Sequence, residues 1–430
     1  MWGNNSEKSA GLLPGRQIFG PLSLCVLCPV FAILLWYTHV ALDGDVFRLA
    51  EFLIDGDRGL LQNIPYNIWR IWPSITALDV KIVLIFMAFQ LVLMKAVPGS
   101  LYLGPTTPNG NVPKYTANGV LSHVITLIAF VCLSDGLSLI AAYVGDPRIP
   151  NGLNLFRIAM IYERFGNLIS FLNVFALIFC AFLYLKGLSF PSSSDSGSCG
   201  NPVFDFYWGT ELYPRIFGWD VKMFTNCRFG LMSWSLILFS YVAAQYEEQG
   251  RVTDAMLVSV VLQFVYCTKF FIWETGYLSS MDIGHDRAGF YLCWGCLVWV
   301  PSVYTSCSIF LVKRTHMLGP YLSTGILLVG LAGIYINYAS DHQRQMFRES
   351  NGKATVWGRP PQYITASYTT AEGETRRSLL LCSGWWGLAR HFHYLPELLA
   401  AFCWCCPGIF GPKANGLCLF YFMFLTLLLL

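Results

Sequence analysis

A short stretch near the carboxyl end of the chain concentrates side chains that can bind or react with a ligand. Residues 380–397 read LLCSGWWGLARHFHYLPE within a predominantly apolar sequence. The polar members of this stretch are Arg390, His391, His393, Tyr394 and Glu397. They span about two helical turns, so several of them can converge on one bound ligand. The stretch therefore indicates a binding site.

A second polar cluster is a pair of arginines in the sequence DHQRQMFRESNGK. Arg344 and Arg348 lie four residues apart, so on a helical extension they share one face. The forked guanidinium of arginine suits contacts with phosphate, which favours a nucleotide site. Juxtamembrane arginines that meet lipid headgroups would give the same spacing, and the spacing alone leaves both interpretations open.

A third cluster places ionisable groups in or beside an apolar segment between residues 253 and 290. Its members are Tyr266, Lys269, Glu274, Asp282, His285 and Asp286. A charged group at membrane depth costs about 2.5–3.5 kcal/mol, so each should have a partner or a function. Lys269 and Glu274 can neutralise each other, and a buried polar network that holds helices together remains an equal alternative to a reactive site.

A fourth patch, Tyr207, Trp208, Glu211 and Arg215, lies in DFYWGTELYPRIFGWD at a predicted helix boundary. An interfacial aromatic belt explains its tyrosine and tryptophan as well as a ligand does. The glutamate and the arginine are not explained by such a belt.

The composition identifies the setting of these clusters as a membrane. Apolar residues make up 55% of the 430 residues and charged residues only 12%, about half the share of a soluble domain. The net charge of +3 comes without any block of like charge, which argues against a nucleic-acid partner. The 15 cysteines lie largely in apolar runs, where cysteine acts as a small packing residue, and their spacing suggests no metal site. Phosphate-binding loops, nucleophile elbows and Rossmann fingerprints are also missing from the sequence.

Hydropathy predicts an all-α polytopic membrane protein with a bundle of about nine or ten transmembrane helices. The expected spans are approximately residues 18–41, 76–97, 119–145, 165–190, 229–246, 253–273, 289–312, 318–338, 392–410 and 415–430. We divide the chain into a polar segment 1–17, a membrane half 18–200 with turn-rich loops, and a membrane half 201–430.

Two loops add to this plan. Residues 97–118 are dense in Gly, Pro and Asn and predict an ordered series of turns. The segment 339–391 carries seven Lys or Arg against four Asp or Glu, which places it in the cytosol by the positive-inside tendency.

Five ordered blocks of the sequence resemble the membrane sterol reductases. They are GPTTPNGNVPKYTANG (104–119), FYWGTELYPR (206–215), IWETGYLSSMDIGHDRAGFYLCWGCLVWVPSVYT (272–305), HQRQMFR (342–348) and LLCSGWWGLARHFHY (380–394). The ARHF string and the WGCLVWVPSVYT block resemble the Δ7-reducing branch of this family, and the SSSDSGSCGN string and the RHFHY form resemble its plant-type members. The resemblance implies NADPH-dependent reduction of the C7=C8 double bond of Δ5,7-sterols by a multi-pass protein of the endoplasmic reticulum membrane. Its implied partners are the sterol substrate, the lipid bilayer and other sterol-biosynthetic membrane enzymes.

The resemblance also implies roles for individual residues. Cofactor-binding positions of the family fall on Arg344, Arg348, Leu381, Trp386, His393 and Tyr394. Saturation of an alkene needs a proton donor on the sterol as well as a hydride donor. Tyr266 is the first candidate for that donor or for a relay, and Glu274 is the second.

The end of the sequence departs from the family pattern. Family members follow the last helix with a polar, basic segment of the form DRxxRDxxRCxxKYGxxWxxYC, whereas this sequence stops at Leu430 in FYFMFLTLLLL. We therefore expect a chain truncated at its C-terminus. An active Δ7-reductase, a catalytically impaired sterol-binding or partner protein, and a Δ14-reductase remain as alternatives. A membrane methyltransferase, which shares an RH-x-x-Y element, is disfavoured by the upstream blocks.

Overall fold

The computed structural model describes residues 16–57, 59–146, 148–369 and 375–429. Seven described helical segments are long and apolar enough to cross a membrane. They are α2 (Arg16–Ala41), α5 (Ala77–Ala96), α9 (Phe165–Ser189), η1 with α11 (Met223–Gly230 and Leu231–Gln249), α12 (Asp254–Ile272), η2 with α15 (Phe290–Tyr304 and Ser306–Leu311) and α16 (Pro320–Glu349). The predicted polytopic helical membrane fold is confirmed.

Three predicted spans are shorter than expected. The expected helix 119–145 is broken into α6 (Gly119–Leu133) and α7 (Gly136–Val144). The break occurs because the backbone near Asp135 pairs with another segment: the Asp135 N–H donates to the Phe156 carbonyl at 3.1 Å and its carboxylate accepts from the Ile158 N–H at 2.8 Å. The last two predicted spans are α17 (Tyr394–Cys405) with η4 (Cys406–Ile409), and η5 (Gly416–Leu419) with α18 (Phe420–Leu429). Each is shorter than the roughly 20 residues that a crossing needs.

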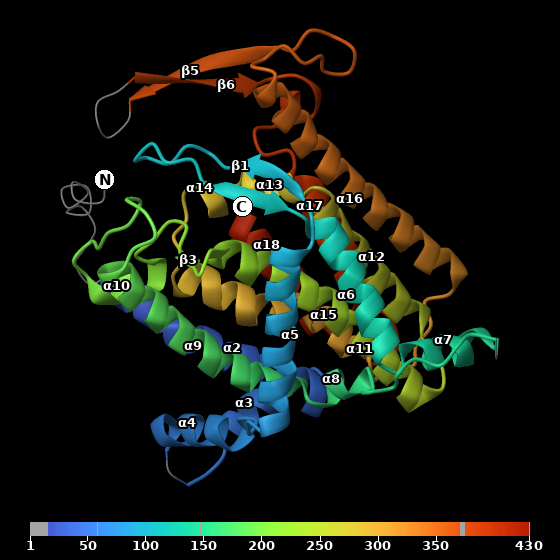
Figure 1. Cartoon of the computed structure of the whole chain (residues 1–430). Helices are drawn as coiled ribbons and strands as arrows, with labels where there is room; N and C mark the ends of the chain where they lie inside the picture. The colour runs from blue at the N-terminus through green and yellow to red at the C-terminus, as the bar shows by residue number, and fades with distance from the viewer. Residues whose placement is uncertain (1–15, 58, 147, 370–374, 430) are drawn as a thin grey trace.

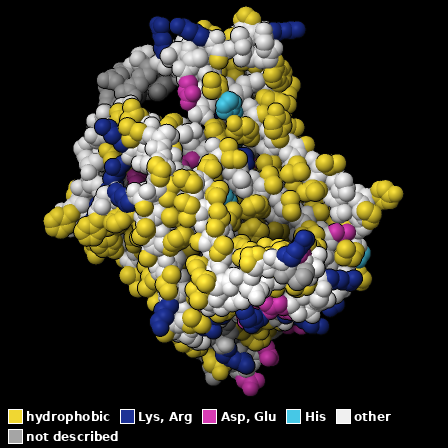
Figure 2. Space-filling view, turned by 45° about the vertical axis from the view of Figure 1, so that its right-hand side comes forward, with side chains coloured by type: hydrophobic (Ala, Val, Ile, Leu, Met, Phe, Trp, Pro, Cys, Tyr) yellow, Lys and Arg dark blue, Asp and Glu magenta, His cyan; other side chains and the backbone are white. Residues whose placement is uncertain are grey.

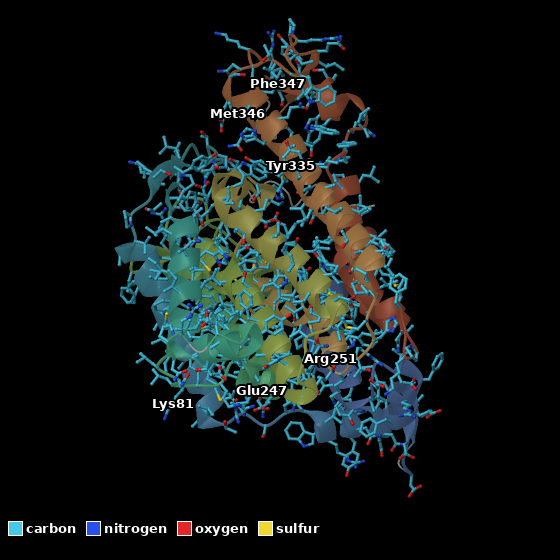
Figure 3. All side chains as sticks on the ribbon, turned by 90° about the vertical axis from the view of Figure 1, so that its right-hand side faces the viewer. Lys81, Glu247, Arg251, Tyr335, Met346 and Phe347 are labelled. Atoms are coloured by element: carbon cyan, nitrogen blue, oxygen red, sulfur yellow. The ribbon has the colours of Figure 1, made fainter. Side chains whose placement is uncertain are left out.

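The segment 339–391 is more regular than a loop. Helix α16 continues to Glu349, which makes it 30 residues and about 45 Å long. The chain then forms an antiparallel hairpin of β5 (Tyr363–Thr369) and β6 (Thr375–Leu381), with Tyr363 opposite Leu381. Figure 1 shows this hairpin at one end of the molecule and α3 and α4 at the other. In Figure 3, Met346 and Phe347 mark the hairpin end of α16, and Lys81 and Arg251 lie at the opposite end.

Short elements connect the long helices. Residues 97–118 form an antiparallel hairpin rather than turns alone, with Tyr102 opposite Tyr115. The connecting elements are α3 (Val46–Ile54), α4 (Leu60–Ile71), β1 (Ser100–Leu103), β2 (Lys114–Ala117), α8 (Ala159–Glu163), α10 (Pro202–Trp208), β3 (Arg215–Ile216), β4 (Trp219–Asp220), α13 (Glu274–Leu278), α14 (Met281–Gly284) and η3 (Gly384–Gly387).

The core lies where α9, η1, α11, α12 and η2 pack together, and it buries large side chains such as Trp234, Tyr241 and Phe290. The segments η1 and η2 are π-helical, a wider helical form that often occurs at functional sites. All 15 cysteines are free thiols and many are buried, as the packing interpretation predicts. Figure 2 shows a broad hydrophobic band on one face, with charged side chains gathered mainly toward its two ends.

Candidate active site

A cavity of about 510 Å³ lies between α12, α13, α16 and α17, and its lining is rich in polar groups. The polar and charged lining side chains include Tyr266, Lys269, Asn337, Asp341, Arg344, Arg348, His393, Tyr394 and Glu397. The cavity therefore joins three of the four clusters that the sequence suggested, namely the 380–397 stretch, the arginine pair and part of the 253–290 segment. We call it the polar cavity.

Helix α16 presents one polar face to this cavity. Asn337, Asp341, Arg344 and Arg348 follow one another at intervals of four, three and four residues, which aligns them on one side of a helix. The Arg344 Nη2 donates to Asp341 Oδ1 at 3.0 Å, and the Arg344 guanidinium lies 4.3 Å from the centre of the Trp386 ring. These contacts fix one edge of the guanidinium, so its other N–H groups are oriented for an anionic ligand.

The GWWG segment (Gly384–Gly387) is joined to α16 by two hydrogen bonds, each of which pairs a backbone group with a side chain. Trp386 Nε1 donates to the Ser340 carbonyl at 2.8 Å, and the Trp385 N–H donates to Gln343 Oε1 at 3.0 Å. Gly384 has a φ of +64°, and a Cβ there would lie 2.3 Å from Gln343 Oε1. A glycine is therefore needed for the close approach that sets Trp386 over Arg344.

His393 and Tyr394 complete this wall of the cavity. Asn337 Nδ2 donates to the His393 carbonyl at 3.1 Å, and the His393 ring lies 4.4 Å from the Tyr394 ring and 5.1 Å from Trp386. His393 precedes α17, outside the seven long spans. Burial, together with the nearby charges of Arg344 and His391, lowers the pKa of His393 to about 4. At neutral pH this imidazole is therefore uncharged and can accept a hydrogen bond.

Arg390 and His391, which precede His393 in the chain, are exposed and do not line the polar cavity. His391 stacks on the Tyr394 ring at 5.0 Å, and Phe392 stacks on Trp385 at 5.2 Å. These contacts order the turn from which His393 and Tyr394 enter the cavity.

Tyr266 lies on α12 at the inner part of the cavity, among aromatic side chains. Its ring is 5.3 Å from Trp404 and 5.7 Å from Trp234, and its hydroxyl lies within hydrogen-bonding reach of the Glu397 carboxylate. Lys269 Nζ sits 4.6 Å from the centre of the Tyr266 ring. Tyr266 thus has an acidic group near its hydroxyl and a cation over its ring, an arrangement that suits a proton donor or relay.

Lys269 and Glu274 do not neutralise each other, contrary to one sequence interpretation. Lys269 Nζ donates to Asn337 Oδ1 at 2.8 Å, whereas Glu274 accepts from Arg228 Nη1 at 2.5 Å and from the Gly119 N–H at 2.9 Å. Arg228 is itself fully buried. This ion pair holds the Glu274 side chain outside the lining of the polar cavity. Glu274 thus joins helices in this structure, and its role as the second candidate proton donor stays a prediction.

Leu381 also lies beside the polar cavity without lining it. It is buried in a small core with Phe347 and Val356, against which Trp386 packs. Leu381 thus supports the position of Trp386, and direct contact of its side chain with a cofactor stays a prediction.

Sequence reasoning did not single out Asn337 and Asp341, and it named Lys269 and Glu397 only in separate polar clusters, without joining them in one cavity. The first two could have been found from the periodicity of α16, because they continue the face of Arg344 and Arg348 by one and two turns. Lys269 follows Tyr266 by three residues on α12 and shares its face. Nothing in the sequence pairs α12 with α17, so the approach of Glu397 to Tyr266 is visible only in the fold.

The remaining polar clusters lie elsewhere and hold the structure together. Glu211 accepts from Lys186 Nζ at 2.8 Å, and Arg215 Nη2 donates to the Lys114 carbonyl at 2.6 Å. Lys222 is fully buried, and its Nζ donates to the backbone carbonyls of residues 282, 283 and 286. These hydrogen bonds tie segments 206–215 and 282–286 to neighbouring elements, so both segments stabilise the fold.

The polar cavity also contains polar atoms that the protein leaves unsatisfied. Among the residues that the structure describes, His393 Nδ1 and Ser280 Oγ are buried without a hydrogen-bond partner, and both residues line the cavity. Buried polar atoms normally have partners, so these atoms are suited to a polar ligand. A phosphorylated nucleotide, with many acceptors and hydroxyls, fits this donor set.

Comparison with known proteins identifies the family. Residues 16–430 match the model of the ergosterol biosynthesis ERG4/ERG24 family. The chain belongs to that family. It is therefore a sterol reductase with a multi-pass membrane fold, as the sequence blocks predicted.

Three relatives illustrate the range of this sterol reductase family. The chain is 50% identical over 410 residues to 7-dehydrocholesterol reductase of Arabidopsis thaliana, covering 95% of this chain and 88% of the relative. It is 34% identical to the enzyme of the same name from Danio rerio, over 88% and 77% of the two chains. It is 35% identical to the Delta(14)-sterol reductase of Methylotuvimicrobium alcaliphilum, over 79% and 73%.

Proposed function

We propose that this sterol reductase uses NADPH to reduce the C7=C8 double bond of Δ5,7-sterols in the endoplasmic reticulum membrane. The observation that carries the choice of double bond is the 50% identity, over 95% of the chain, to a protein named 7-dehydrocholesterol reductase. The polar cavity supports the chemistry, because it brings an arginine pair and a buried tyrosine into one space.

The arginine pair and the aromatic wall are the proposed holders of NADPH. Arg344 and Arg348 would bind its phosphates, and Trp386, His393 and Tyr394 would contact its remaining groups. When bound, NADPH supplies the hydride of the reduction. The neutral His393 ring can accept a hydrogen bond from a ribose hydroxyl or an amide without adding charge.

Tyr266 is the proposed proton donor. Its hydroxyl proton would pass to one carbon of the C7=C8 bond, while the other carbon receives the hydride, so the product gains two hydrogens and one ring double bond remains. The phenolate left behind would be stabilised by Lys269, whose Nζ lies 4.6 Å from the ring centre, and reprotonated by way of Glu397. The rings of Trp404 and Trp234 pack around Tyr266 and would exclude water from its hydroxyl.

A turnover assay tests this proposal. Membranes from a strain that lacks Δ7-reductase, expressing residues 1–430, should remove the conjugated-diene absorbance of a Δ5,7-sterol when NADPH is added. NADH at the same concentration should support a slower reaction, because it lacks the 2′-phosphate that an arginine can bind. Retention of the diene absorbance under both conditions would contradict the proposal.

A Δ14-sterol reductase is the second candidate, favoured by the 35% identity to a protein of that name. The same membranes should be given a sterol with a C14=C15 double bond, and the products separated by mass and retention time. Faster turnover of this substrate than of the Δ5,7-sterol would assign the chain to the second candidate. Association with other sterol-biosynthetic membrane enzymes is a further proposal, which affinity capture from the same membranes can test.

A further inference from the structure

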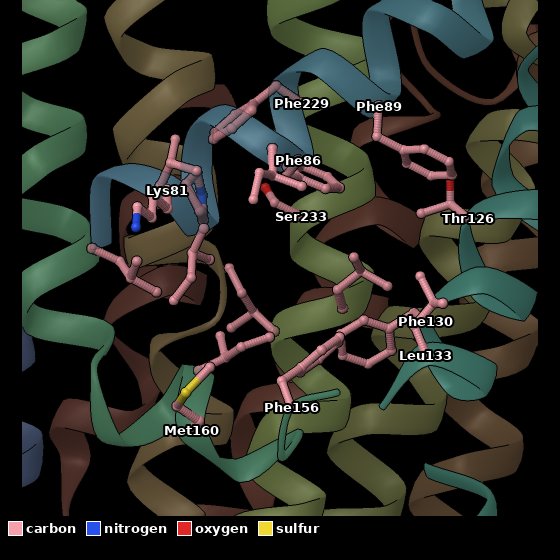
Figure 4. Close-up of a pocket in the computed structure, with 18 of the residues that line it drawn as sticks. Lys81, Phe86, Phe89, Thr126, Phe130, Leu133, Phe156, Met160, Phe229 and Ser233 are labelled. Carbon is pink, nitrogen blue, oxygen red and sulfur yellow. The ribbon is translucent and has the colours of Figure 1, made fainter. Parts of the chain in front are cut away.

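A second cavity, of about 580 Å³, lies between α5, α6, α9 and α11 and shares no lining residue with the polar cavity. Its walls are almost entirely aliphatic and aromatic, and Figure 4 shows Phe86, Phe130 and Phe156 among the side chains around it. We call it the apolar cavity. Its volume lies within the range of ligand pockets.

The apolar cavity is bordered by side chains that face the surroundings of the bundle. Ile85 and Leu133 line it and are 69% and 38% exposed, and both belong to helices with apolar sequences. In a protein that crosses a membrane, such side chains contact lipid hydrocarbon. A ligand of this cavity can therefore come directly from the bilayer.

The two hydroxyl groups in the lining are already used by the protein. Thr126 Oγ1 donates to the Ser122 carbonyl at 2.7 Å and accepts from Gln90 Nε2 at 2.9 Å, and Ser233 Oγ donates to the Gly230 carbonyl at 3.0 Å. Both hydroxyl protons are therefore committed, and a ligand could only donate a hydrogen bond to these two oxygens. The interior therefore suits a plain hydrocarbon chain better than a sterol with a polar end.

Lys81 is the one basic side chain in the lining of the apolar cavity. It is exposed, lies about one turn into α5, and makes no ion pair within the described part of the chain. Figure 4 shows it at one end of the row of lining side chains, with Thr126 and Phe130 at the other, and Figure 3 places it near the end of the molecule opposite the β5–β6 hairpin. A lysine at this position can reach the headgroup region while its stem covers apolar surface.

From this juxtaposition we infer that the apolar cavity binds an anionic phospholipid, with an acyl chain between α5, α6, α9 and α11 and the phosphate at Lys81. The inference is independent of the sterol double bond that the enzyme reduces. The charge of Lys81 complements an anionic headgroup, and one such contact near a membrane surface changes affinity by about fivefold.

Lipid binding to the full chain tests the inference. The purified protein, stripped of lipid in detergent, is titrated with phosphatidylglycerol, phosphatidylcholine and a Δ5,7-sterol, and bound lipid is followed by native mass spectrometry and by the thermal midpoint. Lys81→Gln should weaken phosphatidylglycerol binding about fivefold and leave phosphatidylcholine binding unchanged. Lys114→Gln, at an exposed lysine of β2 outside the cavity, is the matched charge control and should have no effect.

A cavity-filling variant separates chain binding from headgroup binding. Ala129→Trp places a large ring in the apolar cavity and should abolish binding of both phospholipids. Leu185→Trp, at a position of α9 that is 60% exposed outside the cavity, controls for the added ring. Equal binding of phosphatidylglycerol by the parent chain, Lys81→Gln and Ala129→Trp would overturn the inference. Preferential binding of the sterol that Ala129→Trp abolishes would overturn it too, and would assign the cavity to sterol.

Discussion

The polar cavity and the apolar cavity have similar volumes but opposite chemistry. The first, about 510 Å³, gathers an arginine pair, a lysine, three carboxylates, a histidine and four tyrosines. The second, about 580 Å³, presents mainly Phe, Leu, Ile and Val, with Lys81 at its edge. Both cavities lie among membrane helices, so the different polarity of their linings does not come from one cavity lying in a water-exposed domain.

The comparison shows where this fold tolerates buried polar groups. In the polar cavity, Asp341 holds Arg344, Asn337 holds Lys269, and Trp386 covers the guanidinium. Arg344 and Lys269 thus have partners, whereas His393 Nδ1 has no hydrogen-bond partner within the described part of the chain. In the apolar cavity the two hydroxyls are satisfied internally. Among the described residues that line the two cavities, the unsatisfied buried polar atoms belong to the polar cavity, which is why we place the chemistry there.

We expect the largest difference in turnover between variants of the two cavities when the proposed proton donor of the polar cavity is removed. Tyr266→Phe keeps the ring that packs on Trp404 but removes the hydroxyl, and it should lower kcat by about 10²- to 10⁴-fold. Turnover is measured by diene absorbance, and sterol affinity by equilibrium binding, which should not change. Full turnover with normal binding would remove Tyr266 from the mechanism. Phe165→Leu, in the apolar cavity, is the comparison variant and should retain most of the kcat.

The buried pair of Arg228 and Glu274 tests whether every charge near the polar cavity acts in the reaction. Arg228→Met leaves the Glu274 carboxylate buried without its cation and should destabilise the protein by about 3–5 kcal/mol. Arg228→Met combined with Glu274→Met should recover part of that loss, because no unpaired charge remains. The measurements are thermal midpoint and kcat of the surviving fold. A double variant that is as stable as the parent but lacks turnover would show that Glu274 takes part in the reaction.

The arginine pair should control cofactor affinity more than the rate of chemistry. Arg344→Gln removes a charge-assisted contact of about 1.5–3 kcal/mol, which should raise KM for NADPH by about 10- to 100-fold with a smaller change in kcat. Arg344→Lys should recover only part of the affinity, since lysine lacks the fork that contacts Asp341. Arg359→Gln, outside the cavity, serves as the control. An unchanged KM in Arg344→Gln would contradict the phosphate role.

The smallest effect concerns the neutral state of His393. Its folded pKa of about 4 lies below the ordinary histidine pKa of 6.5, so the unfolded chain binds more protons between these values and stability falls as pH decreases through that range. His393→Asn should therefore flatten the decrease in thermal midpoint between pH 6.5 and pH 4. His391→Asn, at an exposed neighbour, should retain the slope of the parent chain. Identical slopes in the parent and His393→Asn would show that His393 is not buried as a neutral group.

Much of the fold could be predicted because the length of an apolar run can be seen in the sequence without knowledge of tertiary contacts. The seven long spans agree closely with the hydropathy of the sequence, and α5 and α9 agree to within a residue at either end. The break between α6 and α7 could not be predicted, because it depends on pairing of Asp135 with residues 156 and 158. The 30-residue length of α16 was also missed, since its last turns are too polar to read as a membrane span.

The sequence by itself determined the membrane class, the family blocks and the two arginines of one helical face, because these depend on composition, order and helical spacing. Only the tertiary structure decided which charges are partners. It joined Glu274 to Arg228 instead of Lys269, and it brought Glu397 of α17 to Tyr266 of α12. The physical reason is that pairing of buried charges depends on helix packing between segments far apart in the chain, which no local pattern of residues encodes.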